Sequence, residues 1–289
     1  MKVATVLMDG GRRVARVDEE AGLVFPFDIP QSESRLGIVC LLQEPILPKT
    51  LPGISLRDVE LLAPVPLPAR NIFCVGKNYH EHAYEFSRSG FDSSAAAGVI
   101  PKYPIIFSKV PESVIATNSD VLIDPRVSTA IDYEAELAVI IGKSGRGISK
   151  EDAFDHVWGY TIINDVTARD IQGRYSQWLI GKSQDTFCPM GPWAVTKDSF
   201  DLDAASVRCF VNGQIRQNAK VSQLIFDIPT IIAALSQGLT LNAGDLIATG
   251  TPAGVGIGFD PPRYLRAGDT VRVEIDGIGA LENRFINIS

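Results

Sequence analysis

The sequence predicts a mainly β fold with a few short helices, built as a mixed barrel or sandwich of strands. Most apolar runs are only as long as strands, and many are rich in β-branched residues. The chain lacks the regular alternation of strand and helix that builds a doubly wound parallel sheet. The pair Asn212-Gly213 separates two short strand-like segments, which is typical of a tight hairpin.

The start of the chain predicts a small β-rich unit. Segments 4–8 and 14–17 flank Asp9-Gly10-Gly11, a turn signal between two strands. Segment 61–68 repeats proline at short intervals, which resists both helix and central strand. We interpret it as a linker. We therefore expect a small N-terminal domain over residues 1–68 and a main domain over residues 69–289.

The main domain is predicted to contain many strands and few helices. The expected strands are 72–75, 105–108, 121–123, 133–141, 158–164, 193–196, 207–211, 245–249 and 270–275. The expected helices are 151–157, 167–175, 221–224 and 228–236. This proportion favours a mixed barrel or sandwich with helices at its margins.

Composition limits the partners and the compartment. A net charge of −7 and a pI near 5.1 argue against a general nucleic-acid binder, which usually has a basic face. They allow an anionic small molecule, because local lysines or a metal can reverse the field in a cleft. No apolar run reaches the length of a membrane span. The four cysteines are widely spaced, which predicts reduced thiols and a cytoplasmic protein.

Two glutamates one residue apart form the first chemical signal. Glu134 and Glu136 lie in an apolar segment that is expected to be a strand, so both point to the same face. Like charges on a half-buried face repel each other, and a divalent cation between them is the simplest remedy. The alternative is an exposed edge strand with two solvated glutamates.

A third acid follows the next expected strand. Asp165 directly follows the segment 158–164 and precedes an expected helix, so it could also be an N-cap. Together with Glu134 and Glu136 it would provide three oxygen ligands, a set that suits Mg²⁺, Mn²⁺ or Ca²⁺ better than zinc. Three carboxylates leave room for water or substrate, so the site would be of the open, catalytic type.

A histidine and a glutamate give a candidate general base. If the stretch after residue 79 is helical, His82 and Glu85 lie three residues apart on one face. A carboxylate fixes the tautomer of the imidazole and raises its basicity. The alternative is a surface helix with solvated side chains. Residues 87–98 are small and flexible in composition, and could form a lid.

Together these stretches resemble the fumarylacetoacetate hydrolase family. The resemblance covers roughly residues 70–289, and its motifs occur in the family's order. They are Gly76-Lys77-Asn78-Tyr79, Phe107-Ser108-Lys109, Tyr133-Glu134-Ala135-Glu136-Leu137, Asn164-Asp165-Val166-Thr167-Ala168-Arg169-Asp170, Gly181-Lys182-Ser183 and Thr249-Gly250-Thr251-Pro252-Ala253-Gly254-Val255-Gly256.

The resemblance implies a mixed β-roll, usually a homodimer, with Mg²⁺ or Mn²⁺ held by Glu134, Glu136 and Asp165. It implies that His82 and Glu85 are a catalytic dyad. It also implies that five further residues contact a 2-oxo acid substrate or organise the site, with Lys182 stabilising charge during the reaction: Lys109, Arg169, Gln172, Lys182 and Thr251.

The dyad favours hydrolysis among the reactions of the family. We expect His82, oriented by Glu85, to activate a water that cleaves a C–C bond in an acylpyruvate, leaving a pyruvate enolate. Decarboxylation of an oxaloacetate-like 2-oxo diacid would give the same enolate without a base. Isomerisation or hydration of an unsaturated 2-oxo diacid from aromatic catabolism is a further alternative.

Overall fold

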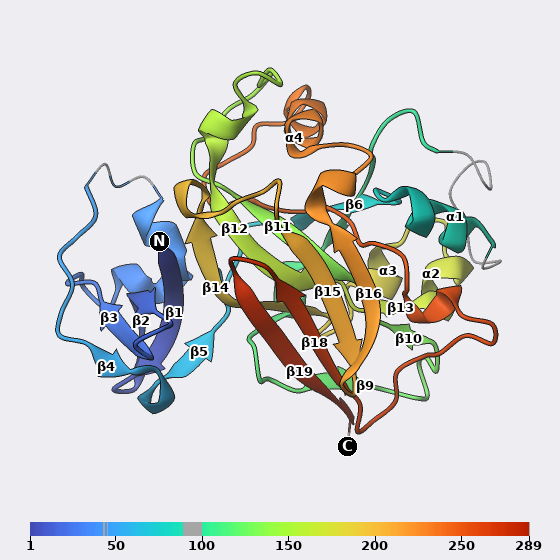
Figure 1. The fold of residues 1–289 in the computed structure, drawn as a ribbon, viewed down its shortest axis with the longest axis horizontal. Coiled ribbons are helices and arrows are strands. Elements are labelled where there is room, and N and C mark those ends of the chain that lie inside the picture. Colours follow the sequence, from blue (N-terminus) through green and yellow to red (C-terminus); the bar gives the residue numbers. More distant parts are fainter. Residues whose placement is uncertain (43, 45, 89–99, 289) are drawn as a thin grey trace.

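The computed structural model describes residues 1–42, 44, 46–88 and 100–288. Its largest sheet has twelve strands, ten of them in the order β4-β3-β2-β1-β14-β12-β11-β17-β6-β7, with β5 paired to β1 and β8 paired to β14. A second sheet has the order β16-β15-β18-β19-β9, and β10 pairs with β13. Figure 1 shows the N-terminal strands at one end of the molecule and α1, α2 and α3 at the other.

The strands are β1 (Lys2–Met8), β2 (Gly11–Asp18), β3 (Leu23–Pro26), β4 (Ile54–Ser55), β5 (Glu60–Leu62), β6 (Ile72–Gly76), β7 (Ile105–Lys109), β8 (Val114–Ile115), β9 (Val121–Ile123), β10 (Ile131–Asp132), β11 (Ala135–Ile141), β12 (Val157–Asn164), β13 (Thr167–Ala168), β14 (Cys188–Thr196), β15 (Ser206–Val211), β16 (Gln214–Lys220), β17 (Leu246–Ala248), β18 (Thr270–Ile275) and β19 (Gly279–Asn287).

The α-helices are α1 (His80–Arg88), α2 (Arg169–Arg174), α3 (Leu179–Lys182) and α4 (Ile228–Ser236). The 3₁₀ segments are η1 (Glu33–Leu41), η2 (Leu56–Asp58), η3 (Pro111–Ser113), η4 (Ala153–His156), η5 (Lys197–Ser199), η6 (Val221–Gln223) and η7 (Gly256–Gly258). Among the described residues, none of the helices is long and apolar enough to cross a membrane.

The two large sheets face each other across the main core. Strands β15, β18 and β19 alternate buried residues with more exposed ones, so one face of their sheet is apolar. That face packs on β11, β12 and β14, and the buried side chains between the sheets form one cluster. This confirms the mainly β fold with mixed sheets. β11 is buried along its whole length because it lies between β12 and β17.

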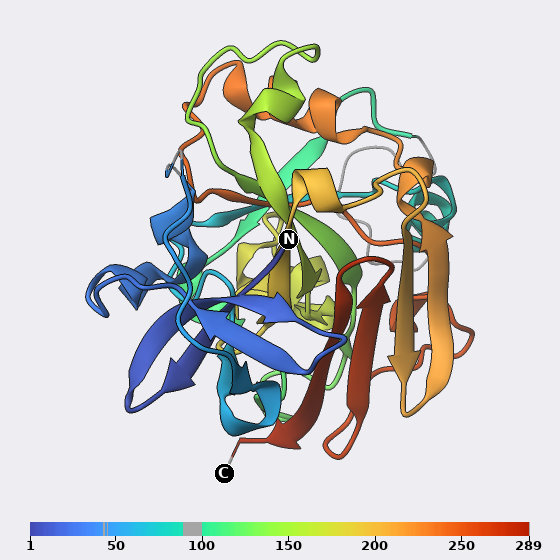
Figure 2. The same cartoon turned by 60° about the vertical axis from the view of Figure 1, so that its left-hand side comes forward.

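The N-terminal strands extend the large sheet. Lys2 and Val3 of β1 pair with Val195 and Ala194 of β14, and Figure 2 shows the blue strands beside the rest of the fold. A second core cluster contains apolar residues from both sides of this junction, among them Val3, Ile38 and Met190. The boundary at residue 68 stays a prediction, and the segments on its two sides share a core.

Local turn and cap signals agree with the structure. Asn212 and Gly213 both have positive φ and join β15 to β16 as a hairpin. Helix α4 begins after Asp227, whose carboxylate accepts a hydrogen bond from the Thr230 amide. The predicted helix 228–236 is therefore confirmed with its bounds.

Three other predicted helices differ from the structure. Segments 151–157 and 221–224 contain only the 3₁₀ turns η4 and η6. The helix expected from residue 167 begins at Arg169, after the short strand β13. The first segment leads directly into β12 of the large sheet, and residues 167–168 pair with β10 in a separate two-stranded sheet. Backbone pairing overrides local helix propensity at both places. Strand β19 was not predicted, because its sequence mixes charged residues with apolar ones over Gly279–Asn287.

Candidate functional site

Strand register brings three acidic side chains together. β11 and β12 are antiparallel, and Ala135 is paired with Asn164. The residue before β11, Glu134, therefore lies beside the residue after β12, Asp165, and the Asp165 amide donates to the Glu134 carbonyl at 2.8 Å. Glu136 is the second residue of β11. The alternation of side chains then places it on the same face as Glu134.

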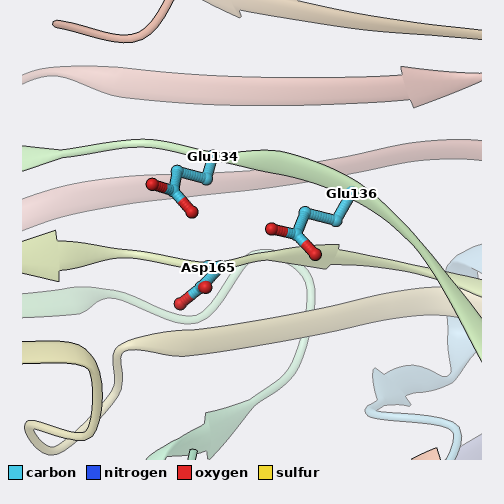
Figure 3. Close-up of side chains that lie close together, drawn as sticks. All are labelled: Glu134, Glu136 and Asp165. Carbon is cyan, nitrogen blue, oxygen red and sulfur yellow. The ribbon is translucent and has the colours of Figure 1, made fainter. Parts of the chain in front are cut away.

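The three carboxylates form a compact, buried cluster. One oxygen from each of Glu134, Glu136 and Asp165 lies within 4.8 Å of the others, and no side chain of the three is more than 5% exposed. Figure 3 shows the carboxyl groups close together at the ends of adjacent strands. The two glutamates are therefore buried, and the alternative of an exposed edge strand with solvated glutamates is wrong.

Three buried cations compensate two of these carboxylates. Asp165 is bound by the ammonium groups of Lys109, at 2.7 Å, and Lys182, at 2.9 Å. Glu134 is bound by Lys182 and by the guanidinium of Arg169, both at 2.7 Å. Each partner is almost completely buried. Such pairs are geometrically fixed, because breaking one would leave a charge unpaired in the protein interior.

Glu136 lacks this compensation. It accepts a hydrogen bond from the Gly250 amide at 2.8 Å, but no ion-pair partner for it is found among the described residues. Burial, followed by the negative charges of Asp165 and Glu134, raises the pKa of Glu136 well above its usual range. For Glu134, Lys182 and Arg169 outweigh the effect of burial and lower the pKa to about 2.

The donor set fits a hard divalent cation. All three groups offer oxygen, their atoms are close enough to share one ion, and one negative charge in the cluster is left without a partner. These are the ligand preferences of Mg²⁺ and Mn²⁺ rather than of zinc. The cluster could therefore bind such a metal.

His82 and Glu85 form the expected pair on α1. The His82 Nδ1 lies 3.2 Å from the Glu85 Oε2, so the Nε2 atom is left for other contacts. The Gly254 amide donates to Glu85 at 3.1 Å, which holds the carboxylate in place. His82 is buried rather than solvated, with 5% of its surface exposed. The suggested lid over 87–98 lies largely outside the described residues.

A small pocket collects most of the predicted residues. Its empty space, including the open mouth, is about 280 Å³. The predicted residues that line it are His82, Glu134, Glu136, Arg169, Gln172, Lys182 and Thr251. Aromatic side chains from Phe86, Phe107 and Trp178 complete the wall.

The other predicted residues lie next to this pocket. Lys109 is fully buried behind Asp165, and its ammonium group also donates to the carbonyls of Val166 and Lys182. Its donors are thus used within the protein. Glu85 lines a neighbouring, more open cavity, so it lies between that cavity and His82.

The structure adds residues that were not singled out from the sequence. Asp132 binds Arg169, Lys77 lines the pocket with φ of 53°, and Gln217 donates to the Thr251 hydroxyl at 2.7 Å. For Asp132 the sequence did contain a signal, because Asp132, Glu134 and Glu136 alternate as residues on one face of a strand do. Gln217 had none, because its contact spans 34 residues.

Comparison with known proteins agrees with this geometry. A sequence model described as "Fumarylacetoacetate (FAA) hydrolase C-terminal" matches residues 71–286. The chain belongs to the fumarylacetoacetate hydrolase family. As a member of that family it is an enzyme, and the resemblance stated from its motifs is confirmed.

Individual relatives narrow the range of reactions. An oxaloacetate tautomerase from Bacillus subtilis, YisK, is 51% identical over 232 residues, which cover 80% of this chain and 74% of the relative. A solved fumarylacetoacetate hydrolase from Exiguobacterium antarcticum has a TM-score of 0.85 and 39% identity over the whole of both chains. A 2-hydroxyhepta-2,4-diene-1,7-dioate isomerase from Mycobacterium marinum has a TM-score of 0.78 and 32% identity, covering 99% of this chain and 98% of its own.

Two of these relatives are named as an oxaloacetate tautomerase and a diacid isomerase, and the third is named as a hydrolase. The first two support the alternative reading of the sequence, which involved oxaloacetate-like and unsaturated diacids, better than acylpyruvate hydrolysis.

Proposed function

We propose that this protein interconverts the keto and enol forms of oxaloacetate or a closely related 2-oxo diacid. The observation that carries the proposal is the His82–Glu85 pair, which places a buried imidazole in a pocket lined by buried cations. The proposal is also supported by the similarity to an oxaloacetate tautomerase.

The cations suit a small dianion. Arg169 and Lys182 line the pocket and carry fixed positive charge, because the acidic partners of each raise its pKa despite burial. The Nη2 atom of Arg169 is buried without a hydrogen-bond partner among the described residues. An anionic oxygen of the substrate would satisfy it. Gln172 and the Thr251 hydroxyl are further donors on the same wall.

The proton shift needs one base and one stabilised oxygen. In our proposal, the His82 Nε2 removes a proton from C3 of the keto acid, while Glu85 holds the Nδ1 proton. The electron pair of that C–H bond forms the C2–C3 double bond, and the carbonyl electrons move to the C2 oxygen. Lys182 stabilises the negative charge there, and the His82 imidazolium returns the proton to this oxygen, which gives the enol and restores the neutral base. The reverse steps restore the ketone.

We propose that Glu134, Glu136 and Asp165 hold Mg²⁺ or Mn²⁺. Bound there, the metal would act as a Lewis acid that polarises the 2-oxo group and lowers the pKa of the C3 proton. Lys109 would position Asp165 rather than contact substrate directly, because its donors are already bound within the protein. As part of the same proposal, we place the protein in the cytoplasm as a homodimer.

Acylpyruvate hydrolysis is the second candidate. A buried histidine oriented by a glutamate is equally suited to deprotonate water, and a structural relative is a fumarylacetoacetate hydrolase. A panel of oxaloacetate, a 2,4-dioxo acid and an unsaturated 2-oxo diacid, each with and without Mg²⁺, separates the two. Tautomerisation predicts rapid loss of the enol absorbance of oxaloacetate, with no cleavage of the dioxo acid.

The decisive variant is His82→Gln. We expect it to slow enol–keto interconversion by about 10²–10⁴-fold, the share of a general base, and to leave Mg²⁺ binding intact. His80→Gln is the matched control, since His80 lies on the same helix with its side chain exposed, and it should keep full activity. Unchanged interconversion in His82→Gln would refute the role of His82.

A further inference from the structure

Asp132 is a buried carboxylate that binds two different parts of the site. It is fully buried at the end of β10. Its Oδ2 accepts a hydrogen bond from the Arg169 Nε at 2.8 Å. On the other side it meets the glycine loop, defined here as residues 249–258, where it accepts from the amides of Gly256 at 2.6 Å and Ile257 at 3.0 Å.

The first contact fixes the orientation of a guanidinium. Arg169 is held at Nε by Asp132 and at Nη1 by Glu134 and Gln172, which leaves Nη2 as its unbound donor. A guanidinium is planar, so fixing two of its nitrogens fixes the direction of the third. Asp132 therefore determines where this free donor points.

The second contact fixes the loop that holds Glu85. The Gly254 amide, two residues before Gly256, donates to the Glu85 carboxylate, which in turn contacts His82. The loop approaches Asp132 closely because position 256 is glycine. A Cβ there would lie 2.7 Å from the Asp132 Oδ1 and 2.4 Å from the Arg263 carbonyl.

We propose that Asp132 is a positioning residue that sets the anion-binding Arg169 and the Glu85-holding glycine loop in one fixed geometry. Asp132 lies outside the pocket lining and outside the acidic cluster, so we infer that it acts through those two neighbours. The inference rests on the proposed function only in taking the pocket as the site of a small carboxylic acid. Its test uses binding and backbone protection, so it does not depend on which reaction is catalysed.

The test compares two aspartates of the same chemistry. Asp132→Asn removes the charge and turns an NH₂ group toward two donors in either orientation of the amide, because Oδ1 accepts from the amides of Gly256 and Tyr133 and Oδ2 accepts from Arg169 and Ile257. Asp245→Asn is the control, because Asp245 is also buried, accepts from the Arg70 Nε at 2.8 Å and from a backbone amide, and lies outside the pocket lining. The probe is oxalate, titrated calorimetrically with excess Mg²⁺, and amide hydrogen exchange reports on the glycine loop.

We expect Asp132→Asn to weaken oxalate binding by about tenfold or more, the effect of losing one charge-assisted contact. It should also speed amide exchange at Gly254–Ile257. Asp245→Asn should lower the melting temperature but change neither readout more than about twofold. In the double variant Asp132→Asn/Arg169→Lys, oxalate binding should be no weaker than in Arg169→Lys alone, because the two residues act as one unit.

The inference is overturned if Asp132→Asn behaves as Asp245→Asn does, with lower stability but normal oxalate binding and loop protection. Failure of the wild-type protein to bind oxalate would overturn it too. If the amide variant does not fold, Asp132→Glu serves, and it should shift both readouts in the same direction. If oxalate binding and amide exchange follow these expectations but the wild-type protein does not interconvert enol and keto forms, only the proposed function is refuted.

Discussion

Glu136 is the member of the acidic cluster whose charge is not compensated. It is buried close to Asp165 and Glu134, and among the residues that the structure describes only the Gly250 amide donates a hydrogen bond to it. An uncompensated buried charge destabilises the folded state unless a cation joins it. Metal binding and stability are thus expected to be linked at this one residue.

We predict that Glu136→Gln has opposite effects with and without metal. In EDTA the melting temperature should rise by about 3 °C, because the amide has no ionised form that burial beside Asp165 and Glu134 disfavours, while its oxygen can still face the Gly250 amide. With excess Mg²⁺ or Mn²⁺, the wild-type protein should gain about 2.7 kcal/mol at 100 times Kd, and the variant should gain none. A metal-induced shift that persists in the variant would contradict the ligand assignment.

The position of Glu85 can be tested through a glycine. A Cβ at Gly258 would lie 1.8 Å from the Glu85 Oε1, so Gly258→Ala must move this carboxylate away from its contact with His82. We predict a loss of kcat of about 10–100-fold with little change in melting temperature, since a flexible side chain yields. Gly238→Ala is the control, because no atom lies within 4 Å of its added Cβ. Equal activity of the two variants would argue against the dyad.

At the scale of single residues, the sequence motifs contained the three acids, the dyad and the buried cations that the structure brings together, but not Asp132 or Gln217. Glu134, Glu136 and Asp165 were predictable because strand alternation and strand ends are local properties. Asp132 and Gln217 act through residues that lie 37 and 34 positions away in the chain. The alternation of Asp132 with Glu134 and Glu136 could have drawn attention to Asp132, but no local pattern identifies the partner of either residue. Their roles could be assigned only from the strand pairing and the path of the glycine loop in the structure.

The turn between β6 and α1 decides where the dyad lies. Asn78 fixes this turn from three sides, since its amide donates to the carbonyls of Thr249 at 2.7 Å and Phe226 at 3.0 Å and accepts from the Phe226 amide at 2.7 Å. It thereby connects the start of α1 to the glycine loop. The preceding residue, Lys77, has positive φ, which a non-glycine residue adopts only where its surroundings impose it.

We therefore predict that Asn78→Ala lowers the free energy of unfolding by about 2–4 kcal/mol, because buried backbone groups lose their partners. Asn71→Ala should be nearly neutral, since Asn71 is exposed and donates only to the Ser108 hydroxyl. Urea unfolding followed by circular dichroism measures both. A small effect of Asn78→Ala would show that the turn is held by other contacts.

Elements with strong local signals were easier to predict than elements made by pairing. α4 has an aspartate cap and an apolar face, and the Asn-Gly hairpin has its own turn chemistry. Strand β19 has neither, and it exists because it pairs with β18 on one side and β9 on the other. Sheet formation at that position is a tertiary effect that local propensity does not contain.

The whole molecule is a large sheet with a core on each face. One core lies against the five-stranded sheet, and the other combines residues of the N-terminal strands and η1 with β6, β11, β14 and β17. The second core packs against β6 and β11, and these two strands also contribute Gly76 and Glu136 to the pocket lining. The sequence suggested a separate unit before residue 68, because prolines mark the connection. The pairing of β1 with β14, nearly two hundred residues later in the chain, could not be predicted from the sequence of either strand.

This shared core predicts that the N-terminal segment is required for the stability of the rest. Deletion of residues 1–68 would expose the edge of β14 and the apolar side chains of Cys188, Met190 and Ala194, which are fully buried in the full chain. Exposed strand edges and apolar patches favour aggregation. We expect the full chain to unfold in one calorimetric transition, and the shortened chain to aggregate or to melt at least about 10 °C lower. A shortened chain that stays monodisperse, melts at the temperature of the full chain and binds Mg²⁺ equally well would show that residues 69–289 form an independent domain.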